Sequence, residues 1–117
     1  MHELSVCQAL IEQVEKLAHE NQAVAVRNIR LQVGPLSGVE IPLLEHAYPL
    51  AAAGTLAEQA ELIIETMPVR VRCNACGAET EASANRLLCG ACGDYHTELV
   101  SGDEMILSRL EFDRQTV

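Results

Sequence analysis

The stretch CNACGAETEASANRLLCGACG, from Cys73 to Gly93, contains the turn sequence Cys-x-x-Cys-Gly twice, with 12 residues between the second cysteine of one copy and the first of the next. A Cys-x-x-Cys spacing brings two sulfurs to one side of a tight turn, and the glycine allows the positive φ that points backbone N–H groups at them. Two such turns supply the four thiolates of a closed tetrahedral zinc site. We therefore predict that one structural zinc ion is bound by Cys73, Cys76, Cys89 and Cys92.

Two other interpretations of these cysteines are a redox-active Cys-x-x-Cys pair and an iron–sulfur centre. A redox pair has no need of a second copy of the turn. Four filled thiolate positions also leave no open coordination position for water, so catalytic zinc is not expected. Because metal ligation contributes free energy to folding, zinc is expected to fold the cysteine-bearing module.

Before the cysteines, the hydrophobic pattern first predicts a helix and then a strand. Apolar residues recur at helical spacing over residues 4–18, which indicates an amphipathic helix that begins almost at the N-terminus. Residues 24–33 alternate between apolar and polar from Ile29 onward, a pattern typical of a half-buried strand. Gly34-Pro35 is expected to end this strand.

A second helix is expected from about residue 39 to residue 53, followed by a strand over residues 60–67. Pro49 does not suit a helix interior, because it lacks an N–H and its ring crowds the preceding turn. We therefore expect this helix to kink or restart near Ala47-Tyr48. After the cysteines, residues 104–112 predict a last strand.

These elements predict an α+β fold, with a three-stranded β-sheet, two α-helices and an inserted small zinc-ribbon-like domain that carries the four cysteines. The expected boundaries place residues 1–68 and 102–117 in the α/β domain and residues 69–101 in the zinc-binding domain. With 117 residues and only three aromatic side chains, the core must be aliphatic and modest in size, so a bound metal would help to stabilise it.

Composition excludes several classes of function. The chain carries a net charge of −9, and none of its segments is basic, which argues against a nucleic-acid-binding surface. It contains no apolar run long enough to span a bilayer and no cationic, apolar leader, so a cytoplasmic protein is expected. In that compartment five cysteines are reduced thiols or metal ligands rather than disulfides.

The first three residues, Met1, His2 and Glu3, predict a second kind of metal site. The α-amine of Met1, the amide nitrogen and imidazole of His2, and the amide nitrogen of Glu3 offer up to four nitrogens in one plane. Ni²⁺ and Cu²⁺ favour square-planar nitrogen coordination, whereas Zn²⁺ and Mg²⁺ do not. The alternative is that the histidine is an exposed side chain without a role.

The remaining cysteine and histidines have structural interpretations. Cys7 falls on the apolar side of the first helix, where a small buried hydrophobe is expected rather than a nucleophile. His19, His46 and His96 are expected to be solvated side chains. His96, which follows the last zinc ligand closely, is also a candidate for an additional nickel contact.

Several stretches together resemble the HypA/HybF nickel metallochaperones, which are hydrogenase maturation accessory proteins. They are Met1-His2-Glu3-Leu4-Ser5, Val33-Gly34-Pro35-Leu36-Ser37-Gly38-Val39-Glu40, Ala52-Ala53-Gly54-Thr55, both Cys-x-x-Cys turns, and Gly102-Asp103-Glu104-Met105. The resemblance covers nearly the whole chain, in order. The chain departs from many relatives at Gly90, where they have proline, and at Pro49, where a helix former is expected.

The resemblance implies a nickel metallochaperone rather than an enzyme. His2 would be the nickel ligand whose side chain matters, with Met1 and Glu3 contributing backbone nitrogens, while the four cysteines bind zinc. The implied partners are a hydrogenase maturation nickel GTPase and the [NiFe]-hydrogenase large subunit precursor, and some members also serve urease. No nucleic acid or membrane partner is implied, and the chain would be a monomer or a homodimer.

The alternative is an acidic zinc-ribbon module that binds other proteins without delivering nickel. Coupling between the zinc and nickel sites is a further hypothesis, because the zinc-binding domain is joined to the rest of the chain through two short segments near Pro68 and Ser101.

Overall fold

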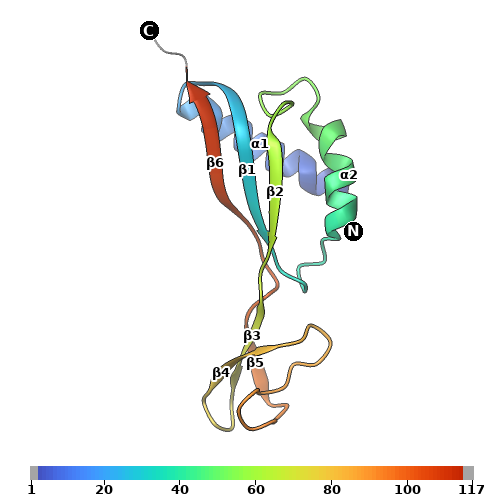
Figure 1. Ribbon diagram of the computed structural model, residues 1–117, viewed down its shortest axis with the longest axis vertical. Helices are drawn as coiled ribbons and strands as arrows, with labels where there is room; N and C mark the ends of the chain where they lie inside the picture. Colours follow the sequence, from blue (N-terminus) through green and yellow to red (C-terminus); the bar gives the residue numbers. More distant parts are fainter. Residues whose placement is uncertain (1–2, 115–117) are drawn as a thin grey trace. The chain divides into compact units, whose positions relative to one another are not determined.

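The computed structural model describes residues 3–114. Within these residues, two helices and six strands follow one another (Figure 1). They are α1 (Glu3–Glu20), β1 (Ala23–Val33), α2 (Ile41–Ala52), β2 (Glu61–Thr66), β3 (Val69–Cys73), β4 (Glu79–Ala82), β5 (Thr97–Ser101) and β6 (Met105–Arg114). One three-stranded sheet has the order β2-β1-β6 and another has the order β4-β3-β5, so the predicted α+β class with an inserted cysteine-bearing part is confirmed.

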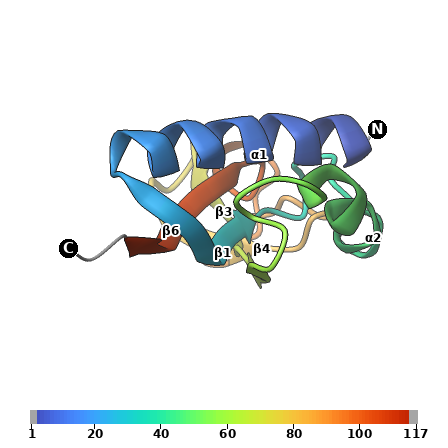
Figure 2. The ribbon, with the colours of Figure 1, turned by 90° about the horizontal axis from the view of Figure 1, so that it is seen from above.

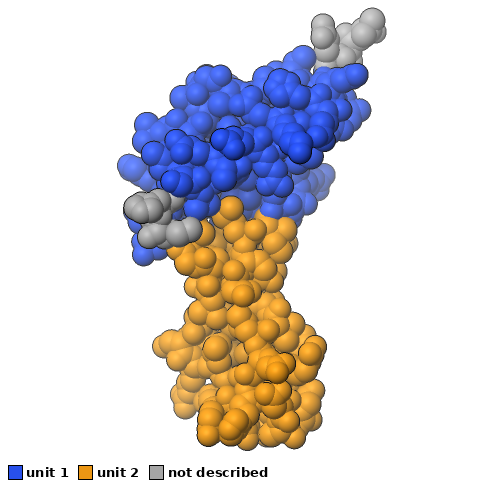
Figure 3. Space-filling model, turned by 180° about the vertical axis from the view of Figure 1, so that it is seen from behind, with its two compact units in different colours: residues 1–31, 40–64, 107–117 blue, residues 32–39, 65–106 orange. Residues whose placement is uncertain are grey.

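Internal contacts divide the chain into two compact units (Figure 3). The first unit comprises residues 1–31, 40–64 and 107–117, and the second comprises residues 32–39 and 65–106. Strands β1, β2 and β6 therefore each contribute residues to both units. Most of the short segment between β1 and α2, up to Val39, belongs to the second unit, together with Cys73, Cys76, Cys89 and Cys92.

Helix α1 lies over one face of the β2-β1-β6 sheet and packs against α2 (Figures 1 and 2). The apolar face predicted for this helix is the buried one, formed by Cys7, Leu10, Ile11, Val14 and Ala18. Its other side carries mainly polar side chains. Burial of this aliphatic stripe removes apolar area from water, which is the main favourable term in folding.

Strand β1 buries Ile29, Leu31 and Val33, as the alternation predicted. Val26 is also buried, so the buried positions change from even to odd numbers between residues 26 and 29. The N–H of Val26 donates to the carbonyl of Leu56, in the loop before β2, at 3.0 Å. The first part of the strand is thus paired with a loop.

For helix α2 the sequence predicts a kink or a restart near Ala47-Tyr48. The helix continues through Pro49 to Ala52, so a restart is wrong, while a kink stays a prediction. The helix starts at Ile41, with Pro42 in its first turn, where a missing N–H costs nothing. Pro49 lies close to the C-terminal end, and its carbonyl still accepts a hydrogen bond from Ala53 at 3.2 Å. The proline therefore removes one hydrogen bond without ending the helix.

The second unit contains a sheet that the sequence interpretation missed. Strand β3 pairs antiparallel with β4 and with β5, whereas the sequence predicted a zinc-ribbon-like domain without assigning strands to it. The signal was present in the alternation of Val69, Val71 and Cys73 with two arginines, and all three of the former side chains are buried. Within residues 3–114, no helix is long and apolar enough to cross a membrane.

Candidate metal centre

The first cysteine turn begins where β3 ends. The sulfur of Cys73 accepts hydrogen bonds from the N–H groups of Ala75 and Cys76, at 3.3 and 3.4 Å. Gly77 closes the turn with a φ of 77° and donates its N–H to the Cys73 carbonyl at 3.0 Å. The glycine is needed here because a positive φ is disfavoured for residues with a Cβ.

The second turn repeats this geometry. The sulfur of Cys89 accepts from Ala91 and Cys92, again at 3.3 and 3.4 Å, and Gly93 has a φ of 79°. The N–H groups of Cys92 and Ala91 lower the pKa of Cys89 to about 6, because hydrogen bonds to a thiolate favour its charged form. These two N–H groups therefore favour the deprotonated form of the Cys89 sulfur, which is the form that binds metals.

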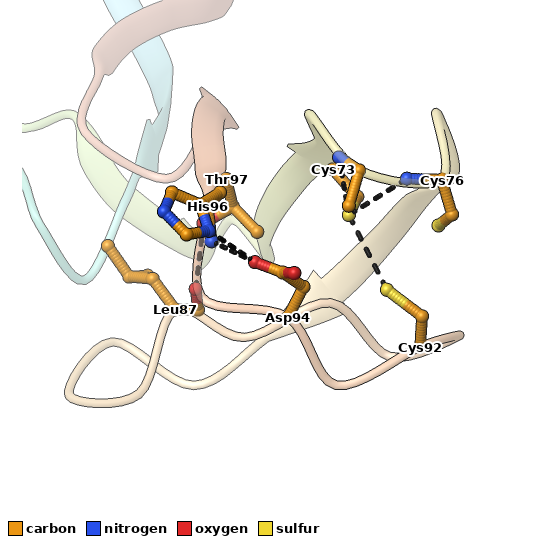
Figure 4. Close-up of polar contacts among 8 residues, drawn as sticks. Cys73, Cys76, Leu87, Cys92, Asp94, His96 and Thr97 are labelled. Carbon is orange, nitrogen blue, oxygen red and sulfur yellow. Dashed lines mark hydrogen bonds and ion pairs between the residues drawn. The ribbon is translucent and has the colours of Figure 1, made fainter.

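The two turns bring all four predicted ligands together. The sulfurs of Cys73, Cys76, Cys89 and Cys92 all lie within 4.8 Å of one another. The Cys73–Cys92 and Cys76–Cys89 sulfur pairs are each 3.6 Å apart, and the first of these pairs is drawn in Figure 4. Four sulfurs placed tetrahedrally at about 2.3 Å from Zn²⁺ would be about 3.8 Å apart. The cluster thus has the dimensions of a tetrahedral four-thiolate metal site.

Gly90 takes part in holding the second turn, a role the sequence interpretation missed. Its N–H donates to the hydroxyl of Thr80 on β4 at 2.8 Å, and a Cβ at this position would lie 3.1 Å from the Thr80 side chain. A proline at this position would have no N–H to donate. The hydrogen bond between Gly90 and Thr80 therefore joins the second cysteine turn to β4.

His96 is not one of the clustered ligands. Its Nδ1 lies 2.7 Å from Oδ1 of Asp94, and Figure 4 shows the imidazole beside this carboxylate rather than beside the labelled cysteines. Among the described residues, the group of clustered ligand atoms contains only the four sulfurs. The hydroxyl of Thr97, the next residue, donates to the Leu87 carbonyl at 2.7 Å and so ties β5 to the loop before the second turn. A nickel contact for His96 stays a prediction.

Met1 and His2, the main residues of the predicted nickel site, lie outside the described residues. Glu3, the third, is the first residue of α1. The first N–H groups of a helix have no acceptor within the helix, so the Glu3 amide nitrogen is not required for the backbone hydrogen bonding of α1. The predicted nickel site takes only this backbone nitrogen from Glu3 and not its side chain.

The side chain of Glu3 has a role that the interpretation missed. It is buried, with 7% of its surface exposed, and its Oε2 accepts a hydrogen bond from the N–H of Glu40 at 3.3 Å. Glu40 is the residue before α2, and its own side chain makes no capping bond. The carboxylate of Glu3 therefore joins the beginning of α1 to the beginning of α2.

Replacing Glu3 with alanine is expected to lower the free energy of unfolding by about 1 kcal/mol, because the N–H before α2 loses a buried acceptor. Glu3→Gln is the matched control, since its amide oxygen still accepts that bond. Urea denaturation of both variants measures the difference. Equal losses in the two variants would contradict the role assigned to the hydrogen bond.

Cys7, His19 and His46 have the burial or exposure that the sequence predicted. Cys7 is completely buried, its sulfur lies 3.5 Å from the Leu44 carbonyl, and burial followed by the nearby Glu3 raises the pKa of its thiol. A buried thiol with a raised pKa is a poor nucleophile, as predicted. His19 and His46 are exposed.

The chain is similar to known proteins over almost its whole length. Residues 1–112 match the family profile described as hydrogenase/urease nickel incorporation, metallochaperone, hypA. The chain is 53% identical over 111 residues to the hydrogenase maturation factor HypA of Nitrosospira multiformis, covering 95% of this chain and 96% of the relative. It is 42% identical over 113 residues to the factor of the same name from Aquifex aeolicus, covering 97% and 98%. Its fold matches the solution structure of the Ni metallochaperone HypA from Helicobacter pylori with a TM-score of 0.72 and 26% identity, covering 98% and 100% of the two chains.

Proposed function

Because the chain belongs to the HypA family of hydrogenase and urease nickel-incorporation metallochaperones, we propose that it binds Ni(II) at its own N-terminus and delivers it during [NiFe]-hydrogenase maturation. Proteins of this family are maturation factors and not enzymes, and hydrogenase-related partners follow from that role. The hydrogenase maturation nickel GTPase, the large subunit precursor and a cytoplasmic location belong to this proposal, as does service to urease.

The four-cysteine cluster supports a division of labour between two metals. In the proposal Cys73, Cys76, Cys89 and Cys92 hold Zn(II) permanently, because four thiolates fill the coordination sphere and leave no position for exchange. Nickel is held by the α-amine of Met1, the nitrogens of His2 and the amide of Glu3. In this proposal residues 69–101 form the zinc-binding domain, and residues 1–68 together with residues 102–117 form the nickel-binding α/β domain.

The observation that carries the nickel proposal is the anchoring of Glu3. Its buried carboxylate is bonded at the start of α2, so the residue that follows His2 is fixed to a folded surface. In the proposal, the nickel ligands directly precede or include the first residue of α1. Because these ligands belong to the beginning of the chain, a docked protein can replace them with its own and take the ion. Nitrogen ligands in one plane would favour Ni²⁺ over Zn²⁺.

Replacing His2 with alanine is expected to weaken nickel binding at least about 100-fold, because the imidazole is the one side-chain nitrogen of the site. Isothermal titration with Ni²⁺ at neutral pH, on protein without an N-terminal tag, measures this, and zinc content is expected to stay the same. His19→Ala is the control, because His19 is an exposed α1 histidine whose imidazole lies 3.9 Å from the carboxylate of Glu15. Nickel affinity unchanged in the His2 variant would overturn the proposal and favour an acidic zinc-ribbon interaction module.

The affinity for nickel is also expected to fall as the pH drops from 8 to 6. The α-amine and the imidazole have ordinary pKa values of about 8 and about 6.5, and both must be unprotonated to bind. Titrations across this range test the expectation, and a pH-independent affinity would contradict the nitrogen ligand set.

A further inference from the structure

Helix α2 has an outward face that is mainly apolar, with Glu45 and His46 as its two ionisable residues. The exposed residues of the helix and the position after it are Pro42, Leu43, Glu45, His46, Pro49, Leu50 and Ala53. Leu43 is 49% exposed and Leu50 is 74% exposed. They are seven residues apart, which is two helical turns, so their side chains emerge on the same side. The opposite side buries Leu44, Tyr48 and Ala52 in the core.

The exposed side of helix α1 has a different composition from that of α2. Its exposed residues are Leu4, Ser5, Gln8, Ala9, Glu12, Gln13, Lys16, His19 and Glu20, most of which are polar. Single exposed leucines need no explanation, but a contiguous apolar face is unusual on a soluble helix and marks an interaction site. We call Pro42, Leu43, His46, Pro49 and Leu50 the α2 face.

The charged residues of α2 and of the segments on either side of it in the chain have one sign. Residues 40–61 include Glu40, Glu45, Glu58 and Glu61, and they contain no lysine or arginine. Glu45 is itself exposed on the helix and borders the α2 face. A partner that covered this face with acidic groups would meet like charges, whereas one with lysine or arginine at its edges would meet opposite charges.

Three kinds of partner could cover the α2 face, and this charge pattern favours one of them. A second copy of the chain in a symmetric pair would place the α2 faces and their glutamates against each other, which is unfavourable. An anionic membrane surface attracts basic segments and repels acidic ones. A protein segment with apolar side chains between basic residues complements both the apolar surface and its acidic border.

The position of the α2 face relates it to the N-terminus. The N–H of Glu40, one residue before the helix, donates to the carboxylate of Glu3, and Glu3 directly follows His2 in the chain. The helix has 12 residues, so the α2 face runs away from this point for about 18 Å. A protein docked along it would hold its own metal ligands near the first residues of the chain.

We infer that the α2 face is the docking surface for a protein that exchanges nickel with the N-terminus, and that this protein presents an apolar segment flanked by lysine or arginine. The inference rests on the proposed function, since it names where the nickel partner binds. It also accounts for Pro49, because a proline near the helix end presents a rigid apolar ring on this side and donates no N–H.

The test measures binding of the chain to each of two purified probes, the hydrogenase maturation nickel GTPase and the hydrogenase large subunit precursor. Leu43→Glu and Leu50→Glu are expected to weaken binding to at least one of them at least about tenfold, as for a buried interface anchor. Val24→Glu, at another exposed apolar side chain, is the control and is expected to leave binding unchanged. Circular dichroism verifies that all three variants are folded.

A second arm tests the charges. Glu45→Lys is expected to weaken the same complex, and the wild-type affinity is expected to fall as NaCl is raised from 50 to 300 mM, because exposed charges are screened by salt. Affinities for both probes that are unchanged in the leucine variants would overturn the inference. A wild-type dimer that Leu50→Glu converts to monomer in sedimentation, or binding to anionic vesicles that this variant loses, would overturn it in favour of those occupants.

The failure of this inference can be told from failure of the proposed function. The leucine variants are expected to bind Ni²⁺ with wild-type affinity, because their side chains are not among the nitrogen ligands. If His2→Ala keeps its nickel, the nickel proposal fails whatever the leucine variants do. If His2→Ala loses nickel and the leucine variants still bind both probes, only the docking surface is wrong.

Discussion

Cys73→Ser is expected to abolish zinc binding and to unfold the β4-β3-β5 sheet. Cys73 is the last residue of β3, and its sulfur accepts two backbone hydrogen bonds that shape the first turn. Serine is a poor ligand for zinc in place of a thiolate, and removal of one ligand opens a closed site. Structural zinc in small domains contributes about 10 kcal/mol or more of folding free energy, so the second unit should not retain its fold without it.

Elemental analysis of the purified variant is expected to find close to no zinc, where the wild type holds about one ion per chain. Amide NMR spectra should lose the dispersed signals of residues 69–101. Cys7→Ser is the matched control, because Cys7 is a cysteine of the α1 core and lies outside the sulfur cluster. A Cys73 variant with full zinc content and an unchanged spectrum would refute a four-thiolate structural site.

Gly34→Ala is expected to be the most destabilising single-methyl change in the chain. A Cβ at Gly34 would lie 2.1 Å from the carbonyl oxygen of Gly102, and this neighbour is backbone, which cannot rotate away. The close approach is held by two hydrogen bonds, from Gly34 N–H to the Glu104 carbonyl at 2.8 Å and from Leu36 N–H to the Gly102 carbonyl at 2.7 Å. Displacement of both is expected to cost about 3 kcal/mol or more.

Urea or thermal denaturation measures this loss, with Gly38→Ala as the control. Gly38 also lies in the segment between β1 and α2, with a φ of 80°, but nothing lies within 4 Å of a Cβ there. Its replacement is therefore expected to cost only the backbone strain, about 1 kcal/mol. Similar losses in the two variants would show that the close contact at Gly34 is not what constrains the backbone.

The four-cysteine centre could be predicted from sequence because its information is local. Each Cys-x-x-Cys-Gly turn closes on itself through bonds between residues two to four apart, so its ligand geometry depends little on the rest of the fold. The helices and the first sheet were predictable for a related reason, since their apolar periodicity records which side is buried. Pro49 misled the interpretation because a proline near a helix end loses only one hydrogen bond.

The long-range features could not be predicted in this way. Nothing local to Glu3 indicates that its carboxylate caps the N–H of Glu40, 37 positions away, and nothing local to Gly34 indicates the carbonyl of Gly102. The apolar residues of α2 were visible in the sequence, but a pattern of high hydrophobicity all round a helix does not tell which side a core will cover.

The sequence by itself determined which four cysteines cluster, the order of the helices and the strands of the first sheet, and the family, because each depends on residue identity, spacing or period along the chain. Only the tertiary structure decided which of these residues meet. The beginning of α1 meets the beginning of α2, β1 ends against the segment after β5, and one side of α2 stays uncovered. Contacts between distant residues depend on how packed elements exclude one another in space, and that information is carried by the whole chain and by no single stretch of it.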